Sequence, residues 1–338
     1  MRLSDIPREE LLPPKTPRVP ISAAWGDRKE RAAFRRYWLA DRLAGPLAEG
    51  ASEISRLVPV GAVSSLGAAL APAFRAGYRN SPASRVLRRA VSAIRPDLSD
   101  EAADALLAAW WRNTARVHAE IPRADHLVAG APVPVAGFEH LAAPLAAGRP
   151  IVAVSVHLGN WELAGTLFPA RIGAGSDWFG LYEPQNLDFV NRIIHRVRTR
   201  NGVTVMPPNL LTSRRIVRLL SGGAANAILF IDAIADGVSP FPLFGRPMPA
   251  RGQARVAVKL ARLADAAVVP CHLLRIGGTR FAFTILPEVK PPAGLSGDAR
   301  DAEMIRRLSA IFEPVVREHL DQWYMMHAAR FPTPPGSG

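Results

Sequence analysis

Residues 150–170, PIVAVSVHLGNWELAGTLFPA, predict a buried strand, a tight turn and a helix in succession. The run IVAVSV is apolar or small and mostly β-branched, which is typical of a strand covered on both faces. His157 follows at the carboxyl end of this strand, and Gly159 and Asn160 form the turn. Asn160 has a side chain suited to capping a helix that begins at Trp161. Ligands bind at the carboxyl ends of strands in open α/β sheets, so we expect the functional site at this turn.

His157 and Glu162 are the two titratable residues of this segment. A neutral imidazole can take a proton from a hydroxyl near neutral pH, because its pKa lies close to the operating pH. A carboxylate bonded to the second ring nitrogen fixes the tautomer and stabilises the imidazolium, and Glu162 in the first helical turn is near enough in sequence to do so. The hexapeptide HLGNWE contains no Ser or Cys nucleophile, so the activated hydroxyl would belong to the substrate. This pattern indicates direct acyl transfer, although a His and a Glu at this spacing also arise without function in a chain with eight histidines.

The whole hexapeptide resembles the signature of the bacterial lipid A late acyltransferases (lauroyl and myristoyl acyltransferases), which belong to the wider glycerolipid acyltransferases with an H-x4-D/E motif. The resemblance extends from about residue 133 to residue 289, with weaker similarity upstream. It implies an α/β fold with a mixed central sheet flanked by helices and a helical N-terminal cap. It also implies an acyl thioester donor, a lipid hydroxyl as acceptor, His157 as general base oriented by Glu162, and no cofactor or metal.

Other residues of the motif and of a second block are candidates for binding substrate. Gly159, Asn160 and Trp161 are expected to do so because they surround the two titratable residues. The second block begins with Asp232, which stands at the carboxyl end of another predicted strand, as His157 does. The family commonly has Gln or His after this Asp, whereas this chain has Ala, so Asp232 is expected either to orient substrate or to cap the loop that follows.

Cationic residues suggest where an anionic group would bind. Arg246 and Arg251 precede a helix predicted from residue 253, where free backbone amides and the helix dipole would help them hold a phosphate. The family often has Tyr-Arg-Pro before an earlier helix, with the Arg facing phosphates, but this chain has Glu183 at that position. This departure leaves lysophospholipid, ornithine lipid and phosphatidylinositol mannoside open as acceptors beside a lipid A precursor.

Composition indicates the cellular compartment of the protein. The 338-residue chain is 49% hydrophobic and 21% charged, so it can bury a sizeable core and is not of the disordered class. Cys271 is its one cysteine, which excludes a disulfide framework and a cysteine-rich metal site. Since the N-terminal sequence also lacks a secretory signal, we expect the reducing, cytosolic side of the membrane.

The net charge of +13 favours anionic partners. Anionic lipid surfaces, acidic carrier proteins and nucleic acid all qualify on charge. Together with the acyltransferase resemblance, this predicts acyl carrier protein or acyl-CoA as donor, a membrane lipid as acceptor and an anionic membrane surface, and no nucleic acid. The expected location is the cytoplasmic face of the bacterial inner membrane, with peripheral or monotopic attachment.

Four segments are expected along the chain. Residues 1–23 are Pro-rich and charged and predict a disordered tail, and residues 331–338 predict a loose C-terminal tail. Residues 24–130 predict helices that contact a membrane interface, and residues 131–330, where strands alternate with helices, predict the α/β acyltransferase core. The uncharged stretch 57–74 contains prolines and glycines, so we expect a buried or interfacial helix there rather than a membrane span. The resemblance, which implies an apolar N-terminal anchor in many members, leaves a short membrane-inserted segment open.

Two groups of charged residues are predicted to lie on helix surfaces. Arg112, Arg116 and Glu120 recur at four-residue spacing, which is typical of exposed ion pairs. The corresponding helix of the resembled family ends near a similar Glu, but we expect surface pairing here rather than a catalytic role. Four arginines crowd the end of another predicted helix, where they would favour its dipole and offer a docking face to an acidic partner: Arg192, Arg196, Arg198 and Arg200.

Two other functions stay open on the sequence alone. A catalytically idle basic protein on this scaffold would bind membranes or nucleic acid, with strong salt-sensitive DNA binding and no acyl transfer. A lipid or thioester hydrolase would use the same histidine with water as the acceptor. Release of free fatty acid that is unaffected by added lipid would favour the hydrolase.

Overall fold

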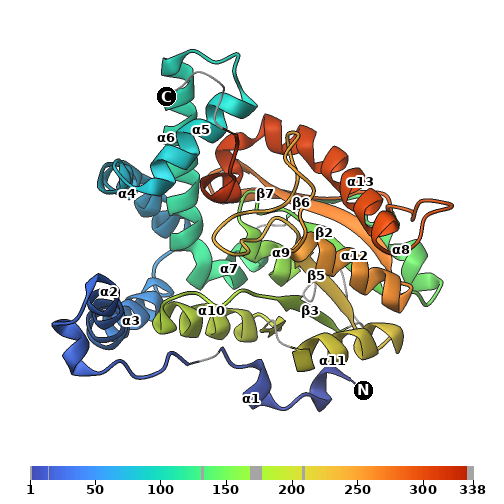
Figure 1. The fold of residues 1–338 in the computed structure, drawn as a ribbon, viewed down its shortest axis with the longest axis horizontal. Coiled ribbons are helices and arrows are strands. Elements are labelled where there is room, and N and C mark those ends of the chain that lie inside the picture. The colour runs from blue at the N-terminus through green and yellow to red at the C-terminus, as the bar shows by residue number, and fades with distance from the viewer. Residues whose placement is uncertain (1, 14, 131–132, 168–176, 208–209, 333–338) are drawn as a thin grey trace.

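The structure is a computed structural model that describes residues 2–13, 15–130, 133–167, 177–207 and 210–332. Within these ranges seven strands form one sheet in the order β1-β7-β6-β2-β5-β3-β4 (Figure 1). Neighbouring strands are parallel except β6 and β7, which are antiparallel, so the predicted α/β fold with a mixed sheet is confirmed. The strands are β1 (Val135–Ala136), β2 (Ile151–Ser155), β3 (Trp178–Leu181), β4 (Thr204–Met206), β5 (Asn226–Phe230), β6 (Ala267–Gly277) and β7 (Arg280–Ile285).

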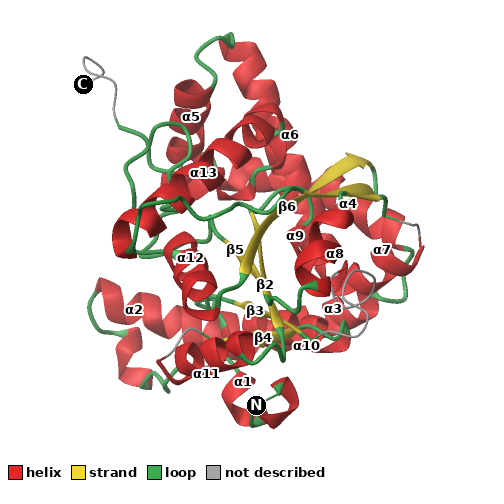
Figure 2. Ribbon diagram, turned by 90° about the vertical axis from the view of Figure 1, so that its right-hand side faces the viewer, coloured by secondary structure: helices red, strands yellow, loops and turns green. Residues whose placement is uncertain are grey.

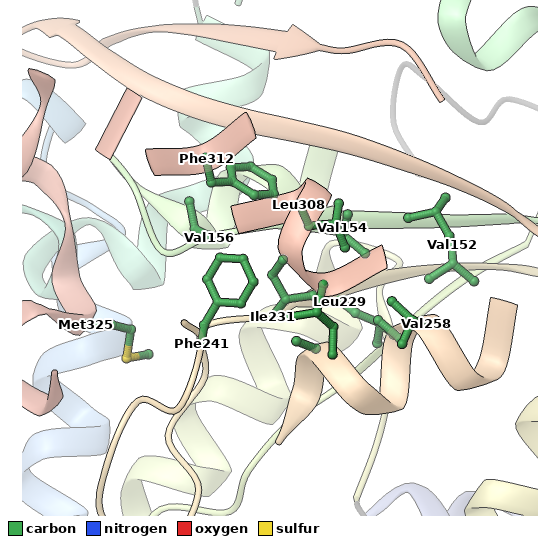
Figure 3. Close-up of a cluster of buried hydrophobic side chains, with 14 of the residues drawn as sticks. Val152, Val154, Val156, Leu229, Ile231, Phe241, Val258, Leu308, Phe312 and Met325 are labelled. Carbon is green, nitrogen blue, oxygen red and sulfur yellow. The ribbon is translucent and has the colours of Figure 1, made fainter. Parts of the chain in front are cut away.

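The central strand β2 is buried on both sides. All five of its residues are buried, and the four apolar ones alternate between two apolar clusters because successive side chains of a strand point to opposite faces. Val152 and Val154 belong to one cluster, together with Leu308 and Phe312 of α13, and Val154 lies beside Leu308 (Figure 3). Ile151 and Ala153 belong to the cluster on the opposite face. The apolar run in the sequence therefore matches a strand that lies in the middle of the core.

Helices cover both faces of this sheet (Figure 2). The cluster that holds Val152 and Val154 also takes in side chains of α11, α12 and α13. The opposite cluster takes in side chains of α7, α8, α9 and α10. These helices are α7 (Ala124–Gly130), α8 (Glu139–Ala146), α9 (Trp161–Leu167), α10 (Asp188–Arg200), α11 (Leu210–Ser221), α12 (Gln253–Ala264) and α13 (Gly297–Glu318), and short turns follow α13 at η6 (Leu320–Gln322) and η7 (Tyr324–Ala328).

The region before the sheet is helical, as predicted. Its helices α4 and α6 lie close together because Gly67 has no side chain: a Cβ there would lie 2.8 Å from the carbonyl oxygen of Ala115. Among the described helices, none has the length and hydropathy needed to cross a membrane. The elements are η1 (Leu3–Asp5), α1 (Arg8–Leu11), η2 (Ile21–Ala24), α2 (Arg28–Phe34), the π-helical η3 (Arg35–Ala44), α3 (Gly45–Ser55), α4 (Val60–Tyr78), α5 (Pro82–Ile94), α6 (Asp100–Glu120) and η4 (Ile121–Arg123).

The described part of the N-terminal segment differs from the disordered tail that its composition predicts. Leu3 and Ile6 are buried in the larger apolar cluster. The hydroxyl of Thr16 donates to the carboxylate of Asp188 at the start of α10, at 2.6 Å. The apolar contacts of Leu3 and Ile6 and the hydrogen bond of Thr16 therefore hold this Pro-rich segment against the core. Residues 333–338 of the predicted C-terminal tail lie outside the described residues.

The buried strand β6 carries a histidine, His272, that makes stability depend on pH. Burial, with a smaller contribution from His319, lowers the pKa of His272 from 6.5 to about 4. Between these values the unfolded chain binds a proton that the folded chain does not, so stability falls as the pH drops below about 6.5. From pH 7.5 to pH 5, we expect the wild type to lose about 2 kcal/mol more unfolding free energy than His272→Gln.

Urea unfolding of both proteins at the two pH values measures this difference. Gln at this position cannot titrate, so the comparison isolates the histidine from the other groups that protonate in the same range. Equal losses of stability in the two proteins would contradict the prediction.

Candidate active site

The predicted strand, turn and helix are present at the centre of the sheet. β2 ends at Ser155, His157 lies two residues further on, and α9 begins at Trp161. Gly159 has a φ of 59°, and a Cβ on it would lie 2.7 Å from the carbonyl oxygen of Leu273 in β6. Glycine is therefore required here both by the left-handed backbone conformation and by the closeness of β6.

The imidazole of His157 is held by Asp232. Nδ1 lies 2.7 Å from a carboxylate oxygen of Asp232, and the backbone N–H of His157 donates to the same carboxylate at 3.0 Å. The indole N–H of Trp323 donates to this carboxylate as well, at 2.9 Å, and Asp232 is fully buried. A carboxylate only accepts hydrogen bonds, so Nδ1 carries the proton and Nε2 keeps its lone pair. Among the described residues, no hydrogen bond reaches Nε2.

This geometry corrects the prediction that Glu162 holds the second ring nitrogen of His157. β2 and β5 are parallel neighbours, so the residues that follow their carboxyl ends lie side by side. His157 and Asp232 are 75 positions apart in the sequence and come together through the sheet. The spacing within one motif carries no information about such a partner.

Glu162 instead forms a buried ion pair with Arg198 of α10. Its carboxylate accepts hydrogen bonds of 2.6 and 3.0 Å from the guanidinium. Burial alone would raise the pKa of Glu162, but the charge and hydrogen bonds of Arg198, with a smaller contribution from His157, hold this pKa below its usual value. Glu162 is therefore an anion at neutral pH, and it interacts electrostatically with His157.

His157, Glu162 and Arg198 line one cavity with a volume of about 910 Å³. Its walls come from α3 and α4 of the N-terminal region, from α10, and from the segments that follow β3 and β5. Apolar side chains from these elements and from η4 line it, including Ala51, Val63, Ile121, Leu181, Ile193 and Ile234. A cavity of this size and lining can hold a fatty acyl chain, with the polar groups gathered at His157.

Aromatic rings form the wall of the cavity beside the imidazole. Trp161 stacks on Tyr324 with ring centroids 4.4 Å apart, and the ring of Phe230 lies 4.6 Å from that of His157. The backbone N–H of Tyr324 donates to the carbonyl oxygen of His157 at 2.9 Å. Trp161 lines the cavity, where it can contact substrate, whereas Asn160 is fully buried and its side chain bonds to the protein.

The two arginines predicted to hold phosphate have different surroundings. Arg246 donates to three backbone carbonyl groups within residues 239–243, so its guanidinium fastens the loop that follows Asp232. Burial lowers the pKa of Arg246 to about 10, partly opposed by the charge of Asp232. Arg251 is exposed and lies 3.5 Å from a carboxylate oxygen of Asp236. Neither residue belongs to the lining of the cavity, and the contacts of Arg246 are those of a loop-holding residue.

The arginines of α10 are paired within the chain. Three of the four form ion pairs with Glu49 and Glu53 of α3, and the fourth, Arg198, binds Glu162. These side chains join α10 to α3 and to α9. They are therefore not the free cations that the predicted docking face for an acidic partner requires.

Sequence reasoning missed the roles of Trp323 and Arg198. Trp323 is buried, and a buried indole N–H needs a hydrogen-bond acceptor, but nothing in the sequence identifies Asp232 as that acceptor. Arg198 is one of four closely spaced arginines, and the sequence does not distinguish it from the other three. In the part of the chain that the structure describes, no group of His, Cys, Asp and Glu side chains has the arrangement of a metal site.

Comparison with known proteins identifies the family to which the chain belongs. No curated protein matches the chain. A family model described as bacterial lipid A biosynthesis acyltransferase matches residues 37–332, a range that contains His157, Asp232 and Trp323. Because this match covers most of the sequence, the chain belongs to the bacterial lipid A biosynthesis acyltransferase family and is an acyltransferase.

Proposed function

We propose that this enzyme transfers a fatty acyl chain from a carrier-protein thioester to a hydroxyl of a lipid A precursor, with His157 as the general base. The observation that supports this most directly is the 2.7 Å contact between Nδ1 of His157 and the buried Asp232, at the wall of a large cavity. It leaves Nε2 as the basic nitrogen. The family supplies the acyl donor and lipid A acceptor as classes, and the carrier protein is our choice of donor because the chain carries a net charge of +13.

The reaction would proceed in two proton-balanced steps. Nε2 of His157 takes the proton of the acceptor hydroxyl while the hydroxyl oxygen attacks the thioester carbonyl carbon, and a tetrahedral oxyanion forms. The oxyanion then collapses, the carbon–sulfur bond breaks, and the thiolate leaves with the proton that Nε2 had taken. The products are the acyl ester and the free carrier thiol, so no cofactor is needed.

Two carboxylates would stabilise the imidazolium that forms between these steps. Asp232 does so through the hydrogen bond to Nδ1, as in a serine hydrolase triad. Glu162 does so through its charge, which Arg198 keeps in place and ionised. In this proposal Glu162 is an electrostatic partner of His157, Trp161 contacts substrate at the cavity wall, and Gly159 and Asn160 shape the turn.

An apolar face of the N-terminal helices supports attachment to a membrane. On α4, Leu66, Leu70 and Phe74 recur every four residues and are exposed by 61%, 45% and 49%. Further exposed apolar side chains follow on the preceding helices and connections: Leu43, Leu47, Ile54 and Leu57. Exposed apolar surfaces on a soluble protein often mark a membrane or partner interaction, and residues of α3 and α4 also line the cavity. We propose that this apolar helix surface lies in the cytoplasmic leaflet of the inner membrane, as peripheral or monotopic attachment.

The catalytic proposal predicts a large loss of activity from two substitutions. His157→Ala removes the base and Asp232→Asn removes the anion at Nδ1, so each is expected to lower kcat/KM by about 10²- to 10⁴-fold. The measurement is transfer of a radiolabelled acyl group from acyl carrier protein, or in parallel from CoA, into a membrane lipid extract. The labelled lipid identifies the acceptor among the lipids that the sequence leaves open, and Glu183 in the cavity lining is one of the residues that it would meet.

Asp301→Asn is the matched control, because Asp301 is another buried carboxylate and pairs with Arg262 outside the cavity. It should lower stability and leave kcat/KM near the wild-type value. Full activity of Asp232→Asn would contradict the proposed role of Asp232, and release of label as free fatty acid, unaffected by added lipid, would indicate a hydrolase.

The membrane proposal predicts that charges on the apolar helix surface weaken binding to lipid. The double substitution Leu66→Glu/Leu70→Glu removes two apolar contacts and adds charges that an anionic bilayer repels, so binding to vesicles containing phosphatidylglycerol should fall by about tenfold or more. Vesicle sedimentation measures this binding. Leu263→Glu is the control, because Leu263 is exposed by 49% on α12; equal binding of the double variant and this control would count against the assigned surface.

A further inference from the structure

Glu120, at the end of α6, is fully buried, although its spacing from Arg112 and Arg116 predicts a surface residue. Its carboxylate accepts hydrogen bonds of 2.8 Å from each terminal nitrogen of Arg275, one of 2.6 Å from Ser64, and one of 2.8 Å from the side-chain amide of Asn160. Both oxygens are thus fully engaged. The sequence pattern failed here because helical spacing cannot tell an exposed stripe from one that faces another helix.

The contact with Asn160 reaches the catalytic turn. Asn160 is fully buried and lies three residues after His157. Since a carboxylate only accepts, Glu120 fixes the amide of Asn160 with its nitrogen toward α6. Nearby, Asn113 accepts from Nε of Arg275 at 2.9 Å, which holds the same guanidinium from a second position on α6.

Arg275, the partner of Glu120, also contacts the segment that bonds to Asp232 and to the backbone of His157. The backbone N–H and carbonyl of Arg275 both bond to the side chain of Gln322, at 2.8 and 3.1 Å. The next two residues, Trp323 and Tyr324, donate to Asp232 and to the carbonyl oxygen of His157. Arg275 therefore contacts both Glu120, which bonds to the turn, and Gln322, which precedes the Trp323 that bonds to Asp232.

A buried ion pair is weak evidence for a role in stability, because taking both charges out of water offsets much of their attraction. The side chain of Arg275 is 8% exposed and that of Glu120 is 0% exposed, so this cost is large here. The hydrogen bond between Glu120 and Asn160 instead restrains the catalytic turn, which is the segment from His157 to Asn160. We propose that Glu120 is a positioning residue that acts through Asn160 to hold His157 in its reactive orientation, an inference that rests on the proposed role of His157 as the base.

Two variants and their combination test this positioning role. Asn160→Ala removes the contact and leaves the ion pair of Glu120 with Arg275, and we expect kcat to fall by about 10²-fold with the donor KM little changed. Asn160→Asp places two carboxylates in contact, so kcat relative to wild type should rise as the pH is lowered and one proton is shared between them. Adding Glu120→Gln to Asn160→Asp reverses donor and acceptor in this contact, so part of the lost kcat should return. The recovery is partial because the same oxygen of Glu120 also accepts from Arg275, a bond that the amide nitrogen cannot keep.

Ser64→Ala is the matched control, because it removes a hydrogen bond to the same carboxylate from α4 without touching the turn. We expect its melting temperature to fall and its kcat to stay near the wild-type value. A merely structural role would make kcat follow melting temperature in all variants, and would give no recovery in the exchanged pair.

The outcomes separate this inference from the proposed function. If His157→Ala is inactive while Asn160→Ala keeps wild-type kcat, or the exchanged pair gives no recovery, the positioning role is wrong and the proposed base stands. If His157→Ala keeps full activity, the proposed function itself is wrong. If Asn160→Ala does not fold, the kcat and pH dependence of Asn160→Asp and of the exchanged pair decide the matter.

Discussion

The hydrogen bond between Nδ1 of His157 and the carboxylate of Asp232 is the interaction on which the site depends. It fixes the tautomer and the direction of the ring, and so leaves Nε2 as the basic nitrogen. The bond exists because β2 and β5 are parallel neighbours whose carboxyl ends adjoin in the middle of the sheet. Trp323 donates to the same carboxylate from the end of the chain, so the closing segment completes the site.

Two buried ion pairs flank this hydrogen bond. Glu162 with Arg198 joins the catalytic helix α9 to α10, and Glu120 with Arg275 joins α6 to the end of β6. Buried charges are tolerated only when each is paired and hydrogen-bonded, and both pairs meet that condition. The first leaves a negative charge near the imidazole, and the second supports the turn, so the two pairs differ in what they contribute to the proposed chemistry.

The sequence predicts the central strand, the start of α9 and the histidine well, because burial on both faces, turn chemistry and helix capping are local properties. It predicts the partner of His157 poorly, because that partner lies across the sheet, and a motif draws attention to the nearer Glu162. Arg246 was expected to bind phosphate because a cation before a helix is a common anion site, but the loop carbonyls take its donors. The prediction that Glu120 lies on the surface was wrong because helical periodicity does not reveal which face of a helix another element covers.

The most direct test of the account is the protonation state of His157, read by ¹⁵N–¹H NMR of histidine-labelled protein near pH 8, with His157→Ala to assign the signals. The account predicts that the ring carries its proton on Nδ1 in the wild type and in Glu162→Gln, and that this tautomer preference is lost in Asp232→Asn. A proton on Nε2 in the wild type, or a signal that responds to Glu162→Gln and not to Asp232→Asn, would contradict it.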